Sequence, residues 1–406
     1  MEMCAAPAVG HPPRCNPSQI CDHPSMQLLG GLTPERFLAE YWQKKPLLVR
    51  QAIPGFRLPL SADELAGLAC EPEVESRLIL EKGGERPWQL EHGPFAEERF
   101  AALPGSHWTL LVQRVNHWVP QVADLLDHFA FLPAWRLDDI MISYAADQGG
   151  VGPHTDQYDV FLLQGAGRRR WQIDASVNDE SPLLDHPELR ILEQFHATDE
   201  WVLAPGDMLY LPPGLAHYGV ALGDGCMTCS VGFRAPGHRD LITAWVDDVI
   251  ALLPDTLRYG DPDLAPTQRP GEIDGKALAR IREIIRQRFI PDEAIDAWFG
   301  RYITQPVEEM FDIEPLSVAE IRARLQRGQI LRRRESARLN YLDGDPFRLF
   351  VEGEEYVVPD GRRPLARLLC DQRHFGPELL SFLEDAGHRE WFAMLQQHAL
   401  VEADDE

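Results

Sequence analysis

Long apolar runs, an excess of positive charge and a high content of cysteine are all lacking in this chain of 406 residues. No stretch approaches the roughly 18 apolar residues that a membrane-spanning helix needs, and the N-terminus lacks the charged-then-apolar pattern of a signal peptide. The chain has seven cysteines, which is too few for a disulfide scaffold at this length. We therefore expect a cytoplasmic protein without a membrane segment.

The charge balance is strongly acidic, with 64 Asp and Glu against 39 Lys and Arg and a formal net charge of −25. Direct binding of nucleic acid needs a basic face, so this balance argues against such a partner. It suits a basic protein instead, because complementary long-range fields speed the encounter of two molecules. Solubility alone would also explain an acidic surface, and the net charge does not separate these two explanations.

The cysteines do not follow the spacing of a zinc site. Cys226 and Cys229 form a C-x-x-C pair in an apolar segment, but no second pair follows them at zinc spacing. We predict that both are packing residues. Three more cysteines lie in the Pro-rich residues 1–25, a tail that we expect to be disordered.

The pattern of apolar residues divides the rest of the chain. The part up to about residue 135 is predicted to consist of helices and turns, starting with a helix capped by Thr33 and opened by Pro34. Short strands separated by Gly, Pro and Asp turns then run from Leu137 to Arg234, which is typical of a barrel-like sandwich of sheets.

Helical spacing returns after Pro236. Three helices are predicted, and each has an apolar stripe that must be covered by something: Leu241–Leu253, Gly275–Ile290 and Asp292–Ile303. From about Pro306 a further helix, with Ser317 as its cap, precedes a hairpin formed by Arg338–Leu342 and Phe347–Val358. Three short helices follow to about residue 400.

His154 and Asp156, together with the later His217, are the residues that point most directly to chemistry. Two imidazoles and one carboxylate can occupy one face of an Fe(II) ion and leave its other positions open. His154 and Asp156 follow a Gly/Pro-rich turn, and we predict that they lie two apart on a strand and so share a face. A Pro-Pro-Gly turn precedes His217 and could direct it back toward them. A lone histidine on a strand is usually not a ligand, so the argument depends on this context.

A cationic strand follows the motif, in the run Gly-Arg-Arg-Arg-Trp-Gln-Ile that ends at Ile173. Period-two alternation places Arg169 on the face of Trp171 and Ile173, and Arg168 and Arg170 on the other. An inward guanidinium needs an anionic partner, because an unpaired buried charge is costly. A dicarboxylate such as 2-oxoglutarate would supply one through a bidentate contact. A salt bridge to a protein carboxylate is the alternative.

Several long motifs resemble those of the bacterial ribosomal oxygenases of the JmjC, cupin-like superfamily. They are Tyr-Trp-Gln-Lys-Lys-Pro-Leu-Leu-Val ending at Val49, Gly-Gly-Val-Gly-Pro-His-Thr-Asp-Gln-Tyr-Asp-Val-Phe around His154, the cationic strand, Leu-Pro-Pro-Gly-Leu-Ala-His ending at His217, and Ser-Val-Gly-Phe-Arg-Ala-Pro ending at Pro236. The resemblance extends from Met26 onward.

The resemblance implies an α+β fold: a double-stranded β-helix (a JmjC, cupin-like jelly roll), a helical dimerisation region and a C-terminal winged-helix-like domain. The corresponding boundaries are 26–236, 237–305 and 306–406. A winged helix suggests DNA binding only by analogy. We read the domain as a protein-contact or structural module, since acidic stretches oppose its main basic cluster, Arg332–Arg334.

The implied activity is that of an Fe(II)- and 2-oxoglutarate-dependent protein hydroxylase that consumes O2. The implied target is an arginine of the basic large-subunit ribosomal protein L sixteen, and members of the family form homodimers. Ser143 is expected to bind 2-oxoglutarate together with Arg169; a hydrogen bond from Ser143 to the backbone is the alternative.

Three residues are candidates for binding the substrate arginine. Asp147 could pair with its guanidinium, Tyr158 could stack on it, and Ser230 could hydrogen-bond it from the last strand of the barrel. Each has an ordinary alternative: an aspartate in a turn, a tyrosine in the core and a serine on a strand.

Two other functions remain compatible with the motifs. The same cofactors would serve a histidyl hydroxylase of another ribosomal protein or a JmjC-type demethylase, because the metal motif does not select the target. A different class is a cupin-like metal-binding protein that recruits partners without catalysis. The open coordination and the inward Arg169 favour an enzyme.

Overall fold

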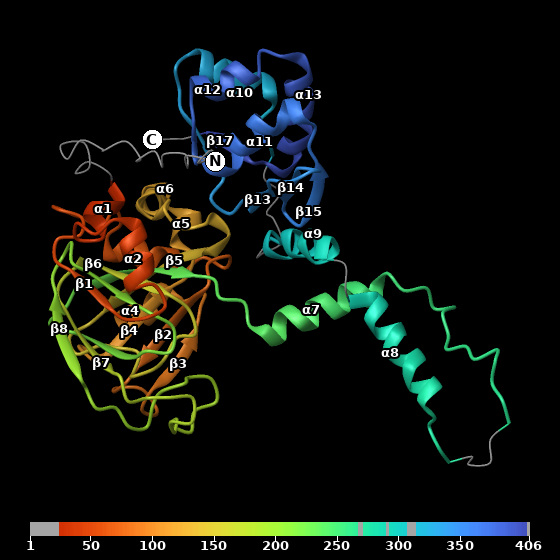
Figure 1. Ribbon diagram of the computed structural model, residues 1–406. Helices are drawn as coiled ribbons and strands as arrows, with labels where there is room; N and C mark the ends of the chain where they lie inside the picture. The colour runs from red at the N-terminus through yellow and green to blue at the C-terminus, as the bar shows by residue number, and fades with distance from the viewer. Residues whose placement is uncertain (1–23, 267–270, 290–291, 307–313, 404–406) are drawn as a thin grey trace, which may run out of the picture. The chain divides into compact units, whose positions relative to one another are not determined.

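The computed structural model describes residues 24–266, 271–289, 292–306 and 314–403 (Figure 1). Residues 1–23 of the predicted tail, which include its three cysteines, lie outside these ranges. The chain divides into two compact units, Met1–Ala235 and Pro236–Glu406. Within the described part, no helix is both long and apolar enough to cross a membrane.

The first unit is built on a large antiparallel sheet of eight strands in the order β1-β9-β6-β11-β5-β4-β2-β3. Four of its strands come from the part of the chain after residue 136: β5 (Leu137–Ala145), β6 (Val160–Ala166), β9 (Met208–Leu211) and β11 (Cys226–Phe233). The other four come from the N-terminal part: β1 (Leu47–Val49), β2 (Ser76–Leu80), β3 (Gln89–His92) and β4 (Trp108–Val112).

The N-terminal strands correct the prediction that residues up to about 135 contain only helices and turns. Ser76–Leu80 and Trp108–Val112 are buried at almost every position. They therefore lack the apolar–polar alternation by which a strand with one wet face is recognised. They pair with each other, and β4 pairs with β5, so they extend the sheet of the barrel.

A small antiparallel sheet faces part of the large one and completes the sandwich. Its order is β10-β7-β8, formed by β10 (Ala216–Ala221), β7 (Arg169–Asp174) and β8 (Asp199–Leu203). Val160 and Leu162 of β6 pack against Trp171 and Ile173 of β7 in one core cluster. The candidate site residues lie on these strands and on the loops between them. The predicted jelly-roll class is confirmed.

Helices cover the other face of the large sheet (Figure 1). The helix predicted to open at Pro34, α2 (Pro34–Glu40), is capped by Thr33 as predicted, and α3 (Ala62–Leu68) has a capping box between Ser61 and Glu64. Phe161 and Phe233, on strands of the sheet, pack with Phe37 of α2 in the larger core. The helical segments are α1 (Pro24–Leu28), α2 (Pro34–Glu40), α3 (Ala62–Leu68), α4 (Glu97–Ala101), α5 (Val115–Trp118), α6 (Pro120–Ala123) and the 3-10 helices η2 (Asp124–Phe129) and η3 (Ala134–Arg136).

The second unit begins with the three predicted helices. They are α7 (His238–Ala251), α8 (Gly275–Phe289) and α9 (Asp292–Ile303). Ile290, the last residue predicted for the second of them, lies outside the described residues. Trp245 of α7 and Trp298 of α9 meet edge to face, with ring centroids 5.4 Å apart.

The rest of the second unit contains the elements of a winged helix. Its helices are α10 (Val318–Gln326), α11 (Arg363–Asp371), α12 (Pro377–Phe382), α13 (Ala386–Leu395) and the 3-10 helices η4 (Asp360–Arg362) and η5 (Gln396–His398). Its strands are β12 (Leu331–Arg333), β13 (Leu339–Leu342), β14 (Arg348–Val351), β15 (Glu354–Val357), β16 (His374–Phe375) and β17 (Val401–Ala403). The predicted cap at Ser317 is a complete capping box with Glu320.

The prediction of one strand over Phe347–Val358 is wrong, because the chain turns at Glu352-Gly353 and pairs back on itself. Both turn residues have positive φ, of 48° and 83°. A two-residue turn of this kind matches the twist of the strands that it joins. The expected hairpin is present, because β13 pairs with β14, and β15 extends it to a sheet of three strands.

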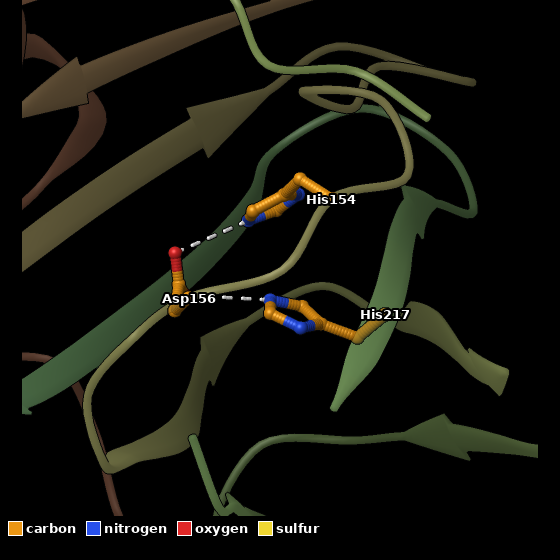
Figure 2. Close-up of side chains that lie close together, drawn as sticks. All are labelled: His154, Asp156 and His217. Atoms are coloured by element: carbon orange, nitrogen blue, oxygen red, sulfur yellow. Dashed lines mark ion pairs between the residues drawn. The ribbon is translucent and has the colours of Figure 1, made fainter. Parts of the chain in front are cut away.

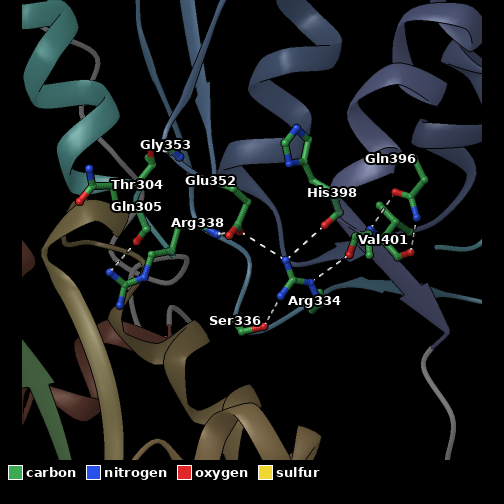
Figure 3. A network of polar contacts seen from close by, with 11 residues as sticks. Thr304, Gln305, Arg334, Ser336, Arg338, Glu352, Gly353, Gln396, His398 and Val401 are labelled. Atoms are coloured by element: carbon green, nitrogen blue, oxygen red, sulfur yellow. Dashed lines mark hydrogen bonds and ion pairs between the residues drawn. The ribbon is translucent and has the colours of Figure 1, made fainter. Parts of the chain in front are cut away.

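The basic cluster Arg332–Arg334 faces the interior of the second unit. Arg332 and Arg334 are 2% and 5% exposed. Arg334 donates hydrogen bonds to the backbone oxygens of Ala399 and His398 and forms an ion pair with Glu352 (Figure 3). These two guanidinium groups are therefore used in holding the domain together.

Candidate active site

His154 and Asp156 lie in the loop between β5 and β6. The predicted strand through them is wrong: β6 begins only at Val160, and His154 forms an isolated bridge. Gly152 adopts φ +84°, and its neighbour is Pro153, so the backbone cannot continue in extended form here.

The two histidines are held together by their own backbones. The amide of His154 donates to the carbonyl of His217 at 3.1 Å, and the amide of His217 donates back at 2.9 Å. His217 lies on β10, which is paired along its length with β7. Asp156 is fixed in turn because its carbonyl accepts the amide of Gly214 at 2.7 Å. The Pro-Pro-Gly turn before His217 therefore does contact the first pair.

The three side chains converge on one point (Figure 2). Each offers a ligand atom, and these atoms lie within 4.8 Å of one another. The carboxylate of Asp156 is 3.9 Å from Nε2 of His154 and 3.6 Å from Nε2 of His217. The same set, two histidines and one carboxylate on one side, is the arrangement that mononuclear Fe(II) oxygenases use.

Hydrogen bonds prepare both imidazoles to act as ligands. Nδ1 of His154 lies 2.9 Å from the carbonyl of Gly152, and Nδ1 of His217 lies 3.0 Å from that of Leu215. A carbonyl only accepts, so each Nδ1 carries a proton, and each Nε2 faces Asp156, on the side where a metal would bind. Burial, with the adjacent His154, lowers the pKa of His217 to about 4. That imidazole is therefore neutral at pH 7, and the three residues fit a divalent metal.

A cavity of about 310 Å³ opens beside the triad, between the two sheets. Ser143, Tyr158, Arg169 and Ser230 from the predicted site line it. Asp147 does not belong to the cavity lining. Its Oδ1 accepts the amide of Gly223 at 2.7 Å, which ties the loop before the triad to the β10–β11 turn.

Arg169 points inward, as the alternation predicts, and is 3% exposed. Its guanidinium carbon lies 5.7 Å from the centre of the Trp171 ring, and its Nε donates to Sγ of Cys226 at 3.5 Å. Nη2 is buried and has no hydrogen-bond partner among the described residues. Within the same part of the chain, Arg169 forms no salt bridge, so the alternative of a protein carboxylate is not supported. An anionic ligand would complete the site.

Two charged residues that no sequence motif indicated also line the cavity. Arg77 projects from β2, and its Nε is buried without a partner among the described residues. Glu188, from the segment between β7 and β8, lines the cavity and bonds His92 of β3 at 2.8 Å. Besides Asp156, Glu188 is the only carboxylate among the described cavity residues. Nothing in the local sequence distinguishes either residue, because only pairing with distant strands brings them here.

Trp171 connects the triad to Arg169, and Gly219 makes room for it. The Trp171 ring lies 5.9 Å from that of His217 and under the guanidinium of Arg169. A Cβ at Gly219, which pairs with Trp171 across the two strands, would meet that ring at 2.6 Å. Even one methyl group at Gly219 must therefore displace a side chain that touches both halves of the site.

Gly219→Ala is accordingly expected to weaken metal binding and 2-oxoglutarate binding together, each by about tenfold, and to lower Tm by several degrees. Calorimetric titration with Co(II) and then with 2-oxoglutarate measures the two effects. Gly232→Ala on β11 is the matched control, because its Cβ meets nothing closer than 3.5 Å. Equal affinities in the two variants would show that Trp171 does not couple the two halves.

A jelly roll that holds this triad beside a cavity between its two sheets is the architecture of a JmjC-type oxygenase. The JmjC-domain model matches residues 124–241, and the model of the ROXA-like winged helix matches residues 283–401. The ribosomal protein uL16 3-hydroxylase of Escherichia coli K12 is 40% identical over 80% of this chain and 85% of its own. The chain belongs to the ribosomal oxygenases, the family expected from its motifs.

Two further comparisons agree. A probable ribosomal oxygenase of Haemophilus influenzae is 33% identical over 80% of this chain and 82% of its own. The structure of the E. coli ribosomal oxygenase YcfD in complex with cobalt and 2-oxoglutarate superposes with a TM-score of 0.77, at 36% identity, over 92% of this chain and 99% of that one.

Proposed function

We propose that this protein hydroxylates an arginine side chain of ribosomal protein uL16 (L sixteen), with Fe(II) as its metal and 2-oxoglutarate and O2 as cosubstrates. The observation that carries the proposal is the pairing of two features on one cavity. These are a triad of two imidazole Nε2 atoms and a carboxylate, and a buried arginine that has no counter-ion among the described residues. The E. coli relative that bears the uL16 hydroxylase name supplies the target.

His154, Asp156 and His217 would hold the metal on one face, and the two carbonyls bonded to Nδ1 would keep both rings in the ligating tautomer. When bound, Fe(II) and 2-oxoglutarate supply the activation of O2 that places oxygen on an unreactive C–H bond and releases succinate and CO2. The contribution of the chain is to orient these groups and to keep the site dry.

Arg169 would bind the distal carboxylate of 2-oxoglutarate, and Ser143 would donate its hydroxyl to the same group. Both line the cavity and both are 3% exposed. A carboxylate placed here neutralises a charge that is already buried, so binding removes a cost that the free protein bears. The protein thereby selects a dicarboxylate over a monocarboxylic keto acid.

The substrate arginine would enter past Tyr158, whose side chain lines the cavity while the residue remains 42% exposed. Its ring can stack on a guanidinium, and Ser230 on β11 can hydrogen-bond it. Glu188 places a carboxylate at the same cavity. Asp147 lies outside the cavity lining, and its Oδ1 accepts hydrogen bonds from the amide of Gly223 and from Nε2 of Gln148, so a substrate guanidinium would meet its Oδ2.

The test is a turnover assay on peptides from uL16. Purified protein with Fe(II), 2-oxoglutarate and O2 is expected to release succinate and to add one oxygen to an arginine, as mass spectrometry of the peptide detects. Histidine-containing peptides of other ribosomal proteins and methyl-lysine peptides are assayed in parallel, because the triad would serve those reactions equally. Addition of oxygen to a histidine, or loss of methyl groups, would replace the proposed target. A protein that only recruits partners would turn over none of them.

The winged helix is proposed to have a structural or protein-contact role without direct nucleic-acid binding. Arg332 and Arg334, its densest basic residues, are buried against protein groups and cannot reach a phosphate backbone. A net charge of −25 for the chain opposes nucleic acid further and favours a basic partner such as a ribosomal protein. Cytoplasmic localisation is proposed on the same ground, since ribosomal proteins are made there.

We also propose that the protein is a homodimer in which a second copy covers the apolar stripes of α7 and α8. Ile242 on α7, and Leu278, Ile281 and Ile285 at helical spacing on α8, are 40–64% exposed in the single chain. Such a stripe is normally buried against a partner.

Ile281→Glu is expected to shift the protein from dimer to monomer, raising the dimer Kd by about a hundredfold. Light scattering after size exclusion at micromolar concentration gives the mass. Glu283→Gln, on the polar side of α8, is the control and is expected to stay dimeric. A wild-type protein that is already monomeric at these concentrations would contradict the dimer.

A further inference from the structure

The sulfur of Cys226 receives two N–H donors, and one of them belongs to Arg169, which lines the cavity. Nε of Arg169 donates to Sγ at 3.5 Å, and Nε2 of Gln164 donates to the same atom at 3.4 Å. All three side chains are buried. The thiol therefore fixes one end of the guanidinium on which the proposed 2-oxoglutarate site depends.

The groups behind Cys226 are uncharged. Nε2 of Gln164 shares its two hydrogens among three acceptors: the sulfur of Cys226 and the carbonyls of Ala166 at 2.7 Å and Met227 at 3.1 Å. Its Oε1 accepts the hydroxyl of Thr228 at 3.1 Å. These bonds leave the Gln164 amide no freedom to turn. The Gln164 amide thus fixes the sulfur of Cys226, which in turn orients Arg169.

We propose that Cys226 is a positioning residue of the 2-oxoglutarate site: it holds the Arg169 guanidinium in place without neutralising it. The proposal rests on the proposed function. A thiol is a weak acceptor and carries no charge in its protonated form. A carboxylate at the same place would form a buried salt bridge and compete with the ligand for the guanidinium. Orientation and charge are thus supplied by different groups, the first by Cys226 and the second by the incoming carboxylate.

The strand geometry separates the two cysteines of the C-x-x-C pair. Residues three apart on a strand point to opposite faces. Cys226 faces the cavity side with Thr228 and Ser230, whereas Cys229 packs in the main core among Phe161 and Val231. The prediction that both are packing residues is confirmed, since both are buried in apolar clusters, but only Cys226 also contacts Arg169. Cys229 therefore supplies an internal control: a buried thiol on the same strand without that contact.

The experiment compares Cys226→Ala with Cys229→Ala in the Co(II)-loaded, full-length protein. The primary readout is the Kd of 2-oxoglutarate from calorimetry, and the second is the separation of KM from kcat with Fe(II) and peptide. Cys226→Ala is expected to raise the Kd and the KM for 2-oxoglutarate about three- to tenfold, with kcat at saturating 2-oxoglutarate within about twofold of wild type. Cys229→Ala is expected to keep the wild-type Kd.

Two more variants test the separation of orientation from charge. Cys226→Ser keeps an uncharged acceptor and is expected to bind 2-oxoglutarate within about threefold of wild type. Cys226→Asp is expected to lose about a hundredfold or more in affinity, because its carboxylate occupies the guanidinium. Circular dichroism and Tm show whether the aspartate variant is folded; if it is not, the alanine and serine variants decide.

The outcomes are separable. If Cys226→Ala binds 2-oxoglutarate like wild type and Cys229→Ala, Cys226 has no positioning role. A fall in the kcat of Cys226→Ala without a change in its Kd for 2-oxoglutarate would also exclude a positioning role. If the wild-type protein itself fails to bind 2-oxoglutarate, or if Arg169→Met binds it equally well, the proposed function fails and this inference fails with it.

Discussion

Replacing Asp156 by alanine is expected to lower kcat/KM for the uL16 peptide at least about a thousandfold and to abolish stoichiometric metal binding. Asp156 is the only anionic member of the triad, and its two oxygens lie 3.9 and 3.6 Å from the two Nε2 atoms. Without it, two neutral imidazoles face the metal, and a divalent ion loses both a ligand and its charge compensation.

Metal content by mass spectrometry and turnover by succinate release measure this effect. Folding is expected to be unchanged, because the backbone of Asp156 keeps its bond to Gly214 and the side chain is at the cavity surface. Glu200→Ala, an exposed carboxylate on β8, is the control for nonspecific loss of charge. Wild-type metal content in the Asp156→Ala protein would refute the triad.

The sequence carried enough information to predict which residues would meet at the metal, but not how the backbone presents them. The predicted group of His154, Asp156 and His217 is the one that the structure brings together. The predicted placement of His154 and Asp156 on one face of a strand is wrong, because Pro153 and the positive φ of Gly152 force a loop. The backbone bridge between the two histidines has no sequence signal, because it joins segments more than sixty residues apart.

For Arg169, in contrast, the sequence does predict the direction in which the backbone presents the side chain. Its inward direction follows from strict alternation with Trp171 and Ile173, a local pattern, and the structure has it buried. The contact of Arg169 with Cys226 could not be anticipated, since it depends on how β7 and β11 face each other in the folded barrel. Likewise, Arg77 and Glu188 reach the cavity only through the pairing of β2 and the path of the segment after β7. Residues whose direction is set by their own strand are predictable, and those placed by long-range packing are not.

Arg169→Met is expected to have two opposite effects: loss of 2-oxoglutarate binding and a gain in stability of the ligand-free protein. Arg169 is 3% exposed and its guanidinium has no carboxylate partner among the described residues, so the free protein bears the cost of a buried charge. A methionine of similar length keeps most of the contact with Trp171 and removes that cost. We expect the unit that carries the site to gain about 1 kcal/mol, a rise in Tm of about 2–4 °C.

Ligand binding is expected to reverse the order of stability of the wild type and the Arg169→Met variant. In the presence of Co(II) and saturating 2-oxoglutarate the wild type is expected to be stabilised, since a ligand that binds only the native state raises Tm by mass action. The variant, with at least about a hundredfold weaker binding, is expected to show almost no shift. Arg168→Met, exposed just before the same strand, is the control and should behave as wild type in both conditions. A ligand-free variant less stable than wild type would mean that the charge of Arg169 is compensated within the protein. Arg169 would then not depend on the carboxylate of a ligand for its counter-ion.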